Sequence, residues 1–275
     1  MTTRRRLPWS AALLACWALV GSCLAGPSKY CPDGGPIRFA HYEFGLIFNR
    51  RSGTGIDDDI QRELAQRTGC RFEVSLQPRA RSWTDLESGN LDMLGSGVQN
   101  PQRDRFAWYA HYVVEINKVL LADSVPDHVT SLAEFEAAKD LRMGTVRSFS
   151  FGPFYDAAMV RLQAAGRLDQ VGDTEAVFRM FAAGRFHAFV SSQFVYGHYV
   201  KQLGLKTPRR VENWDADPGT PSGLTLSKKR FSAEQAAAWQ LLVQSMLDDG
   251  TVRRILVQYM GEAEADASLY RAKRR

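Results

Sequence analysis

The sequence lacks the short motifs by which many catalytic and nucleotide-binding sites are found. No Gly-x-x-x-x-Gly-Lys phosphate loop and no His-Glu-x-x-His zinc motif occur in the 275 residues. Ser96 stands in Leu94-Gly-Ser-Gly-Val98, which does not have the Gly-x-Ser-x-Gly spacing of a nucleophile elbow. The five histidines have no sequence neighbours that suggest a metal site. Motifs therefore indicate no catalytic residues, no metal and no cofactor.

Basic stripes and long apolar runs are also missing. The net charge is only +5, and part of it belongs to arginines and lysines at the two ends of the chain. The body carries no basic stripe with interleaved aromatic residues, so nucleic acid is not an expected partner. After the first 25 residues, no run is long and apolar enough to form a membrane helix.

The first 25 residues have the order of a signal peptide. Arg4–Arg6 precede the apolar run Trp9–Val20, which is too short to span a bilayer comfortably, and small residues follow. We predict cleavage after Ala25 and export to the periplasm. Alternatively, Val20-Gly-Ser-Cys23 resembles a lipoprotein processing box, which would leave Cys23 as a lipid-carrying N-terminus. Simple cleavage is the favoured alternative.

Only four cysteines are present, and two of them lie in the targeting segment. Cys31 and Cys70 remain, each shortly before a predicted strand, Ile37–Ala40 and Phe72–Leu76. If those strands are parallel neighbours, their starting ends are close together. A disulfide is then expected in an oxidising compartment. The alternative is two unrelated free thiols.

Strand and helix patterns alternate through the chain, as in α/β proteins with mostly parallel sheets. Strands are predicted at Ile37–Ala40, Phe72–Leu76, Leu91–Leu94, Leu141–Val146 and Phe186–Val190, with a long extended run at Val113–Ala122. Helices are predicted at Asp57–Thr68, from a capping box at Ser82 to Gly89, and at Phe154–Ala165, Asp173–Ala183, Gln193–Leu203, Ser232–Asp248 and Thr251–Met260. The charged remainder, 262–275, is predicted to be a mobile or fraying tail.

The stretch from Gly95 to Arg103 has the composition of an anion site. Gly95-Ser96-Gly97, after a predicted strand, would let a ligand approach bare backbone. Asn100-Pro101 is typical of a cap and first residue of a helical turn that carries Arg103. Backbone donors, a helix N-terminus and a guanidinium would together bind an anion. A solvated surface loop with an ordinary arginine is the alternative.

One internal similarity predicts two related lobes. Gly89-Asn-Leu-Asp-Met-Leu-Gly-Ser96 resembles Gly184-Arg-Phe-His-Ala-Phe-Val-Ser191, 95 residues further on. The copies lie on either side of the extended run. Since ligands of open α/β sheets bind beyond the carboxyl ends of strands, two facing lobes would form a cleft that can close.

In order and spacing, several stretches resemble the bacterial extracellular solute-binding proteins, family 3, of ABC transporters. They are Gly55-Ile-Asp-Asp-Asp-Ile, Leu86-x-x-Gly-x-Leu-Asp92, Asn100-Pro-Gln-Arg103, Tyr109-Ala-His-Tyr112, Gly184-Arg-Phe-His-Ala and Asp249-Gly-Thr251. The resemblance implies a two-lobed type II periplasmic binding fold. It divides the chain into 1–25 signal peptide, 26–120 lobe 1, 121–222 lobe 2, 223–261 lobe 1 again, and the tail. It also implies a monomer with a small-molecule solute and a membrane permease as partners.

The ligand residues that the resemblance implies match unevenly. Arg103 matches the arginine that grips the ligand carboxylate, whereas Ser192 stands where an aspartate takes the ammonium. Arg79 stands near a position that often holds an apolar or aromatic contact, and Glu43 is a substitute ammonium partner. The expected set is Tyr42, Glu43, Phe44, Arg79, Ser96, Gly97, Asn100, Arg103, Arg147, Ser148, Phe149 and Ser192. The expected ligand is a small carboxylate-bearing solute, an amino acid or a related organic anion.

Two other functions are open on the same fold. Some periplasmic cyclohexadienyl dehydratases resemble this family, and such an enzyme needs a general acid in the cleft, for which Glu43, Asp59 and His111 are candidates. A sensing or accessory subunit would use the same clamp to report a ligand to a partner protein.

Overall fold

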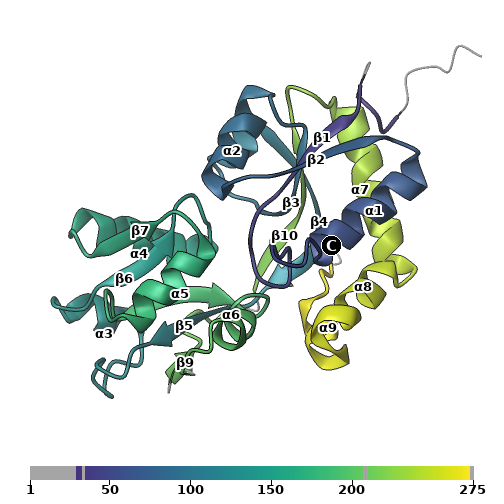
Figure 1. Ribbon diagram of the computed structural model, residues 1–275. Coiled ribbons are helices and arrows are strands. Elements are labelled where there is room, and N and C mark those ends of the chain that lie inside the picture. The colour runs from purple at the N-terminus through teal and green to yellow at the C-terminus, as the bar shows by residue number, and fades with distance from the viewer. Residues whose placement is uncertain (1–28, 33–34, 207, 209, 218, 273–275) are drawn as a thin grey trace, which may run out of the picture.

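The computed structural model describes residues 29–32, 35–206, 208, 210–217 and 219–272, and it has two lobes (Figure 1). The predicted signal peptide and Cys23 lie outside the described residues. Lobe 1 comprises β1 (Ile37–His41), α1 (Ile56–Thr68), β2 (Phe72–Leu76), α2 (Arg79–Ser88), β3 (Met93–Val98), the 3-10 helix η1 (Arg103–Arg105), β4 (Ala107–Glu115), β10 (Thr220–Ser227), α7 (Ala233–Asp248), α8 (Thr251–Met260) and α9 (Glu262–Ser268). Lobe 2 comprises β5 (Asn117–Leu121), α3 (Leu132–Ala137), β6 (Met143–Val146), α4 (Pro153–Ala164), β7 (Leu168–Val171), α5 (Thr174–Ala182), β8 (Ala188–Ser192), α6 (Tyr196–Gln202) and β9 (Arg210–Glu212).

The two lobes repeat one sheet topology. The strand order is β2-β1-β3-β10-β4 in lobe 1 and β7-β6-β8-β5-β9 in lobe 2. In each, the second strand is parallel to both its neighbours, and the third strand has an antiparallel strand on its other side. β3 and β8 therefore occupy equivalent central positions. They carry the two similar segments of the sequence, so the predicted pair of related α/β lobes is confirmed.

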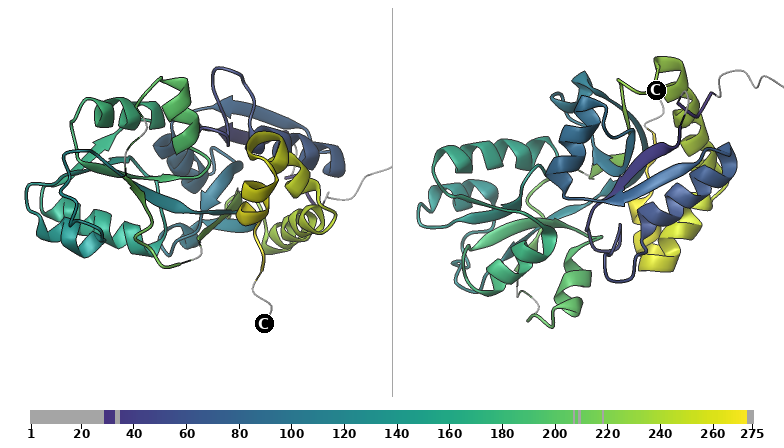
Figure 2. Two further views of the ribbon diagram at one scale, coloured as in Figure 1. Left: turned by 90° about the horizontal axis from the view of Figure 1, so that it is seen from below. Right: turned by 45° about the horizontal axis from the view of Figure 1, so that its top comes forward.

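The chain crosses between the lobes twice. The first crossing is at Ile116, between β4 and β5, and the second lies between the end of β9 and the start of β10. The predicted divisions after 120 and after 222 fall a few residues inside β5 and β10. Figure 2 shows the lobes side by side from two further directions.

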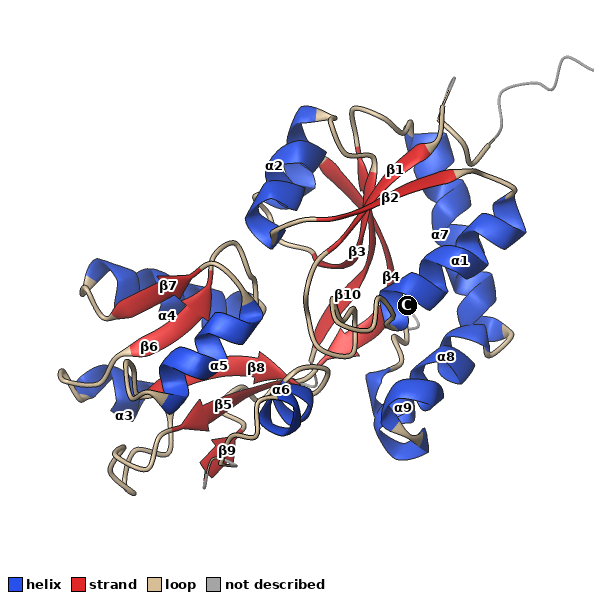
Figure 3. Cartoon of the chain, viewed as in Figure 1, coloured by secondary structure: helices blue, strands red, loops and turns tan. Residues whose placement is uncertain are grey.

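Helices cover both faces of the lobe 1 sheet (Figure 3). Successive side chains of a strand point to opposite faces of the sheet, so the helices on the two faces pack against alternate residues. Phe39 and Met93 pack in the cluster that includes α1 and α7. Ala40 and Leu94, one residue later on each strand, pack instead with Trp83 of α2. Burial on both faces explains why these strands are continuously apolar in the sequence.

The predicted disulfide is confirmed. Cys31 and Cys70 are bonded with their Cα atoms 5.6 Å apart. Their positions follow from the sheet, because β1 and β2 pair in parallel from Ile37 and Phe72. The starts of the two strands are therefore adjacent, as a disulfide requires.

Four details of the predicted elements were wrong. Ser82 does not cap a helix, because α2 begins at Arg79 after Pro78 and buries Ser82 inside it. β3 runs on to Val98, so the glycines lie within the strand rather than beyond it. Two short strands, β7 and β9, were missed. The tail contains a docked helix, α9, in which Ala265 and Ser268 are fully buried.

No described helix is both long and apolar enough to cross a membrane.

Candidate functional site

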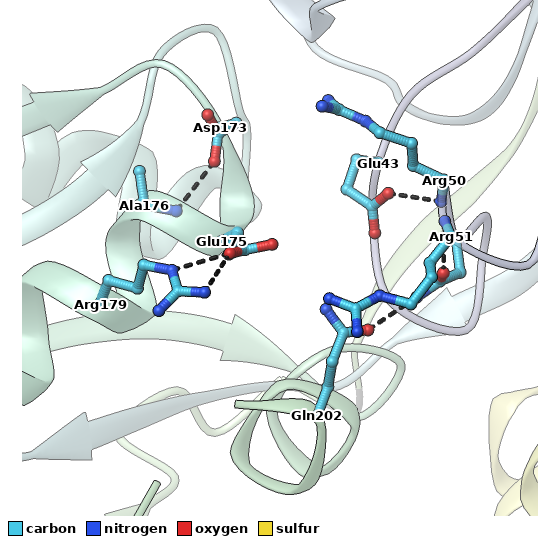
Figure 4. A pocket seen from close by; sticks show the side chains of 9 residues that line it. Glu43, Arg50, Arg51, Asp173, Glu175, Ala176, Arg179 and Gln202 are labelled. Atoms are coloured by element: carbon cyan, nitrogen blue, oxygen red, sulfur yellow. Dashed lines mark hydrogen bonds and ion pairs between the residues drawn. The ribbon is translucent and has the colours of Figure 1, made fainter. Parts of the chain in front are cut away.

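A cavity of about 570 Å³ lies between the lobes. Both lobes contribute to it at the carboxyl ends of strands, where ligands of α/β sheets bind. It is lined by Tyr42, Glu43, Arg50, Leu76, Gln77, Pro78 and Arg79 from lobe 1 and by Val146, Arg147, Phe149, Gly172, Asp173 and Thr174 from lobe 2. A second cavity of about 380 Å³, whose lining residues are drawn in Figure 4, shares Glu43, Arg50 and Asp173 with it, so the two cavities adjoin. We call them together the cleft.

Arg79 forms the lobe 1 wall of the cleft. Because Pro78 starts α2, Arg79 is its first residue and lies directly after the end of β2. Its guanidinium carbon lies 3.8 Å from the ring centre of Tyr42 and 4.9 Å from that of Trp83. Nη2 donates a 2.9 Å hydrogen bond to the carbonyl of Ser96, and the side chain is 6% exposed. A cation between two aromatic rings is held by cation–π attraction as well as by that hydrogen bond.

Ser96 is fixed by a buried hydrogen-bond network. Its φ of +44° is in the left-handed region, which is uncommon for a residue other than glycine. Its Oγ donates to Asp57 Oδ1 at 2.8 Å, its N–H donates to the Tyr112 hydroxyl at 3.0 Å, and that hydroxyl donates to the same Asp57 oxygen. Burial raises the pKa of Asp57 to about 6, although the hydrogen bonds from Tyr112 and Ser96 oppose the rise. The network therefore holds the carbonyl that binds Arg79.

The glycines beside Ser96 serve packing rather than ligand approach. A Cβ on Gly95 would lie 2.1 Å from Asp57 Oδ2, and one on Gly97 would lie 1.9 Å from Thr225 Oγ1. Protein atoms thus occupy the space that the sequence suggested a ligand would use. The prediction of bare backbone open to a ligand at this point was wrong.

Arg103 lies behind the cleft and connects the lobes. Its guanidinium stacks 3.8 Å from the ring centre of Trp83 and donates to the carbonyls of Val98 and Ser148, each at 2.7 Å. Ser148 belongs to lobe 2, so this last bond joins the two lobes behind the cleft. Burial, together with the nearby charge of Arg79, lowers the pKa of Arg103 to about 10. The Asn100 side chain accepts from the Arg103 N–H at 2.9 Å, which confirms its predicted capping geometry.

Aromatic rings close the floor of the cleft. Phe149 lies 5.1 Å from Phe44 and 6.0 Å from Tyr42, measured between ring centres, in edge-to-face contacts across the lobes. The turn that presents Phe149 requires Ser148 to adopt a φ of +64°. Arg147, just before this turn, is exposed, and its guanidinium makes no hydrogen bond or ion pair with any described residue, although its backbone N–H donates to the Val171 carbonyl.

Glu43 contacts lobe 2 directly. Its carboxylate accepts from the Tyr199 hydroxyl at 2.7 Å and from the Arg50 N–H at 2.5 Å, and its carbonyl accepts from Thr174 Oγ1 at 3.1 Å. Asn49 adds a second interlobe contact, at 2.7 Å from His198 Nε2. The lobes are therefore held together by polar contacts on one side of the cleft.

Of the twelve residues predicted for the site, five line the larger cavity: Tyr42, Glu43, Arg79, Arg147 and Phe149. The other seven, Phe44, Ser96, Gly97, Asn100, Arg103, Ser148 and Ser192, lie outside its lining. Ser192 is fully buried opposite Asn117 in β5, and its Oγ has no hydrogen-bond partner among the described residues. It is Ser191 that matches Ser96 in the internal repeat.

Sequence reasoning missed Arg50 and the lobe 2 segment Gly172–Thr174. The second could have been found from the repeat, because the same 95-residue offset carries Gln77 onto Gly172 and Arg79 onto Thr174. Both segments follow the equivalent strands β2 and β7 and open the helices α2 and α5. The site is thus assembled from corresponding loops of the two lobes.

Two of the three candidate acids lie away from the cleft lining. Asp59 accepts from the Tyr259 hydroxyl at 2.7 Å, where α1 meets α8. His111 lies on β4 between Tyr109 and Tyr270, and burial lowers its pKa to about 4. Within the described residues, no group of His, Cys, Asp and Glu is arranged to hold a metal ion.

The chain belongs to the bacterial extracellular solute-binding proteins, family 3, whose model matches residues 40–262. Three solved structures show how widely the fold is shared. A histidine kinase sensor domain with similarity to periplasmic binding proteins matches at a TM-score of 0.69 and 15% identity, over 82% of this chain and 96% of that chain. An ancestral arginine-binding protein bound to arginine matches at a TM-score of 0.67 and 19% identity, over 83% of this chain and 99% of that chain.

The third is the ancestral amino acid-binding protein AncCDT-1, a precursor of cyclohexadienyl dehydratase, at a TM-score of 0.65 and 18% identity, over 82% of this chain and 96% of that chain. At these identities the likeness shows the fold alone. No curated protein sequence matches the chain. The family and the two-lobed α/β fold make this a solute-binding protein of the periplasmic binding class.

Proposed function

We propose that the protein is a periplasmic receptor that captures a small carboxylate-bearing solute in the cleft and delivers it to the permease of an ABC transporter. The observation that carries the proposal is Arg79, a buried guanidinium that lines a cavity between two lobes. A guanidinium fixed in a site of low water content is a strong partner for a carboxylate. Family membership supports the receptor role, and the predicted signal peptide supports the location.

Arg103 joins Arg79 in this proposal. In the structure its Nη2 donates to the carbonyl of Ser148 in lobe 2. When lobe 2 moves away, that carbonyl leaves and Arg103 regains a free donor beside Trp83. The incoming carboxylate takes the place of the Ser148 carbonyl, and lobe 2 closes on the other side of the solute. A micromolar receptor needs about 8 kcal/mol of net binding free energy.

A screen of melting temperatures tests the proposal. A solute that binds only the native state raises the melting temperature by mass action. We expect carboxylates to do so in the wild type and to lose the effect in Arg103→Ala. Arg105→Ala, on the same turn but exposed, is the matched control. Stabilisation by an amine without a carboxylate, undiminished in Arg103→Ala, would refute the role of Arg103.

A dehydratase is less well supported. Of the candidate acids only Glu43 lines the cleft, and both of its carboxylate oxygens accept hydrogen bonds from Arg50 and Tyr199. A general acid has to reach the substrate with a proton of its own. Turnover of prephenate or arogenate by the purified protein would reverse this preference.

A further inference from the structure

The charges around the cleft are unbalanced. Three arginines line the larger cavity: Arg79 at the start of α2 and Arg50 in the loop between β1 and α1, both in lobe 1, and Arg147 in lobe 2. The guanidinium groups of Arg50 and Arg147 make no ion pair or hydrogen bond with any residue that the structure describes. In Figure 4, Arg50 extends from lobe 1 toward the space in front of Asp173. The lining therefore offers several cationic groups to a ligand.

The two carboxylates of the same lining accept hydrogen bonds from described residues on three of their four oxygens. Glu43 accepts from the Arg50 N–H and from the Tyr199 hydroxyl, one with each oxygen. Asp173 Oδ1 accepts from the Ala176 N–H at 2.8 Å and so caps α5. A ligand ammonium would compete with the protein's own donors for these oxygens, and burying a charge without a partner is strongly unfavourable.

Two aromatic faces beside the cleft that would attract a cationic ligand are likewise occupied. Tyr42 and Trp83 enclose a cation, but that cation is the protein's own Arg79. Arg79 is held there by the Ser96 carbonyl. A basic ligand would therefore meet a fixed positive charge instead of an open aromatic face.

We propose that the cleft selects a solute with two acidic groups and no cationic group, such as a dicarboxylate. This rests on the proposed receptor function and names its ligand class. One acidic group binds the lobe 1 arginines, Arg79 and Arg103. The other binds Arg147, with Arg50 beside it at the cleft entrance. Closure of the lobes then brings positive charge to both ends of the solute, so a monocarboxylate would leave Arg147 unmatched.

Pairs of probes that differ in one group test this proposal. Glutarate and L-glutamate differ by the ammonium, and glutarate and butyrate differ by one carboxylate. Succinate, adipate and phthalate extend the range of lengths, and L-arginine is the cationic probe. Dissociation constants are measured by calorimetry on the full mature chain. We expect a dicarboxylate to bind at least about tenfold more tightly than its monocarboxylate or amino-acid counterpart.

Two variants connect the selectivity to named residues. Arg147→Ala removes an exposed side chain and should weaken dicarboxylate binding by about tenfold or more, while monocarboxylate binding changes little. Arg185→Ala is the matched control, because Arg185 is also an exposed lobe 2 arginine but lies before β8, outside the cleft lining. Arg79→Ala vacates the space between Tyr42 and Trp83. It should weaken the binding of glutarate and strengthen the binding of L-arginine.

The outcomes separate this inference from the receptor function. If L-glutamate, butyrate or L-arginine binds the wild type as tightly as every dicarboxylate, the protein remains a receptor and the dianion proposal is overturned. Equal dicarboxylate affinity in the wild type and Arg147→Ala would overturn it too. If no acid of the set binds at all, the proposed function fails, and the inference fails with it.

Discussion

The Tyr112→Phe substitution removes the central hydroxyl of the network beneath the cleft. That hydroxyl donates to Asp57 and accepts the N–H of Ser96, and all three groups are buried. A hydrogen bond to a charged group contributes about 1.5–3 kcal/mol, and a buried N–H without a partner costs about 1–3 kcal/mol. Allowing for partial relaxation, we expect the free energy of unfolding to fall by about 3 kcal/mol when Asp57 is ionised.

The same variant has a predicted pH dependence. The pKa of Asp57 in the folded protein is raised to about 6, so the native state binds this proton more tightly than the unfolded chain does. The contribution of Asp57 to stability therefore increases as the pH falls through about 6 and is lost as the pH rises. Losing the Tyr112 hydroxyl raises this pKa further. The destabilisation should then shrink by about 1 kcal/mol between about pH 8 and about pH 5.

Urea unfolding followed by circular dichroism at the two pH values measures both quantities. Tyr109→Phe, on the same strand, is the matched control, because the Tyr109 hydroxyl is buried without a hydrogen-bond partner among the described residues. Its removal should change stability by less than about 1 kcal/mol. A loss of less than about 1 kcal/mol in Tyr112→Phe, or a loss that is the same at both pH values, would refute the role assigned to the network.

Three further predictions concern the rest of the fold. Reducing the Cys31–Cys70 bond, which joins residues 39 apart, should lower the free energy of unfolding by about 4 kcal/mol, and unchanged urea unfolding after reduction would contradict this. Ala265→Asp places a charge in the buried face of α9 and should lower the free energy of unfolding by about 2–4 kcal/mol, measured by thermal unfolding. Ala263→Asp, on the exposed face, should change it little. Equal effects of the two substitutions would show that α9 is not docked. Asn49→Ala removes the hydrogen bonds to His198 and Gln202 and should increase the radius of gyration measured by X-ray scattering. Ser52→Ala, at an exposed position, should leave the radius unchanged. An unchanged radius in both variants would contradict a role of the Asn49 contact in holding the lobes closed.

The fold could be predicted from local pattern because its elements carry their own signals. The buried apolar positions Ile60 and Leu64 mark the inner face of α1, and Gly69 ends it in the left-handed conformation that a side chain would disfavour. The disulfide followed from the parallel pairing of β1 and β2. The repeat around Ser96 and Ser191 followed from two strands that occupy equivalent places in two sheets.

The site was harder to predict because long-range contacts decide which polar groups remain free. Nothing near Gly95 in the sequence reveals that Asp57, 38 positions earlier, fills the space beside it. Similarly, Arg103 has the local setting of a ligand contact, yet Ser148 of the other lobe takes one of its donors. The short strand β7 gave too weak a pattern to be noticed, so Gly172–Thr174 was missed with it.

The central claim is that a small acidic solute is held between Arg79 of one lobe and Arg147 of the other. The most direct measurement is a crystal structure of the protein with the acid that binds it most tightly. We expect the solute in the cleft, with one acidic group on Arg79 and Arg103, the other on Arg147, and the Ser148 carbonyl displaced from Arg103. A solute bound outside the cleft, or bound with its acidic groups away from these arginines, would contradict the account.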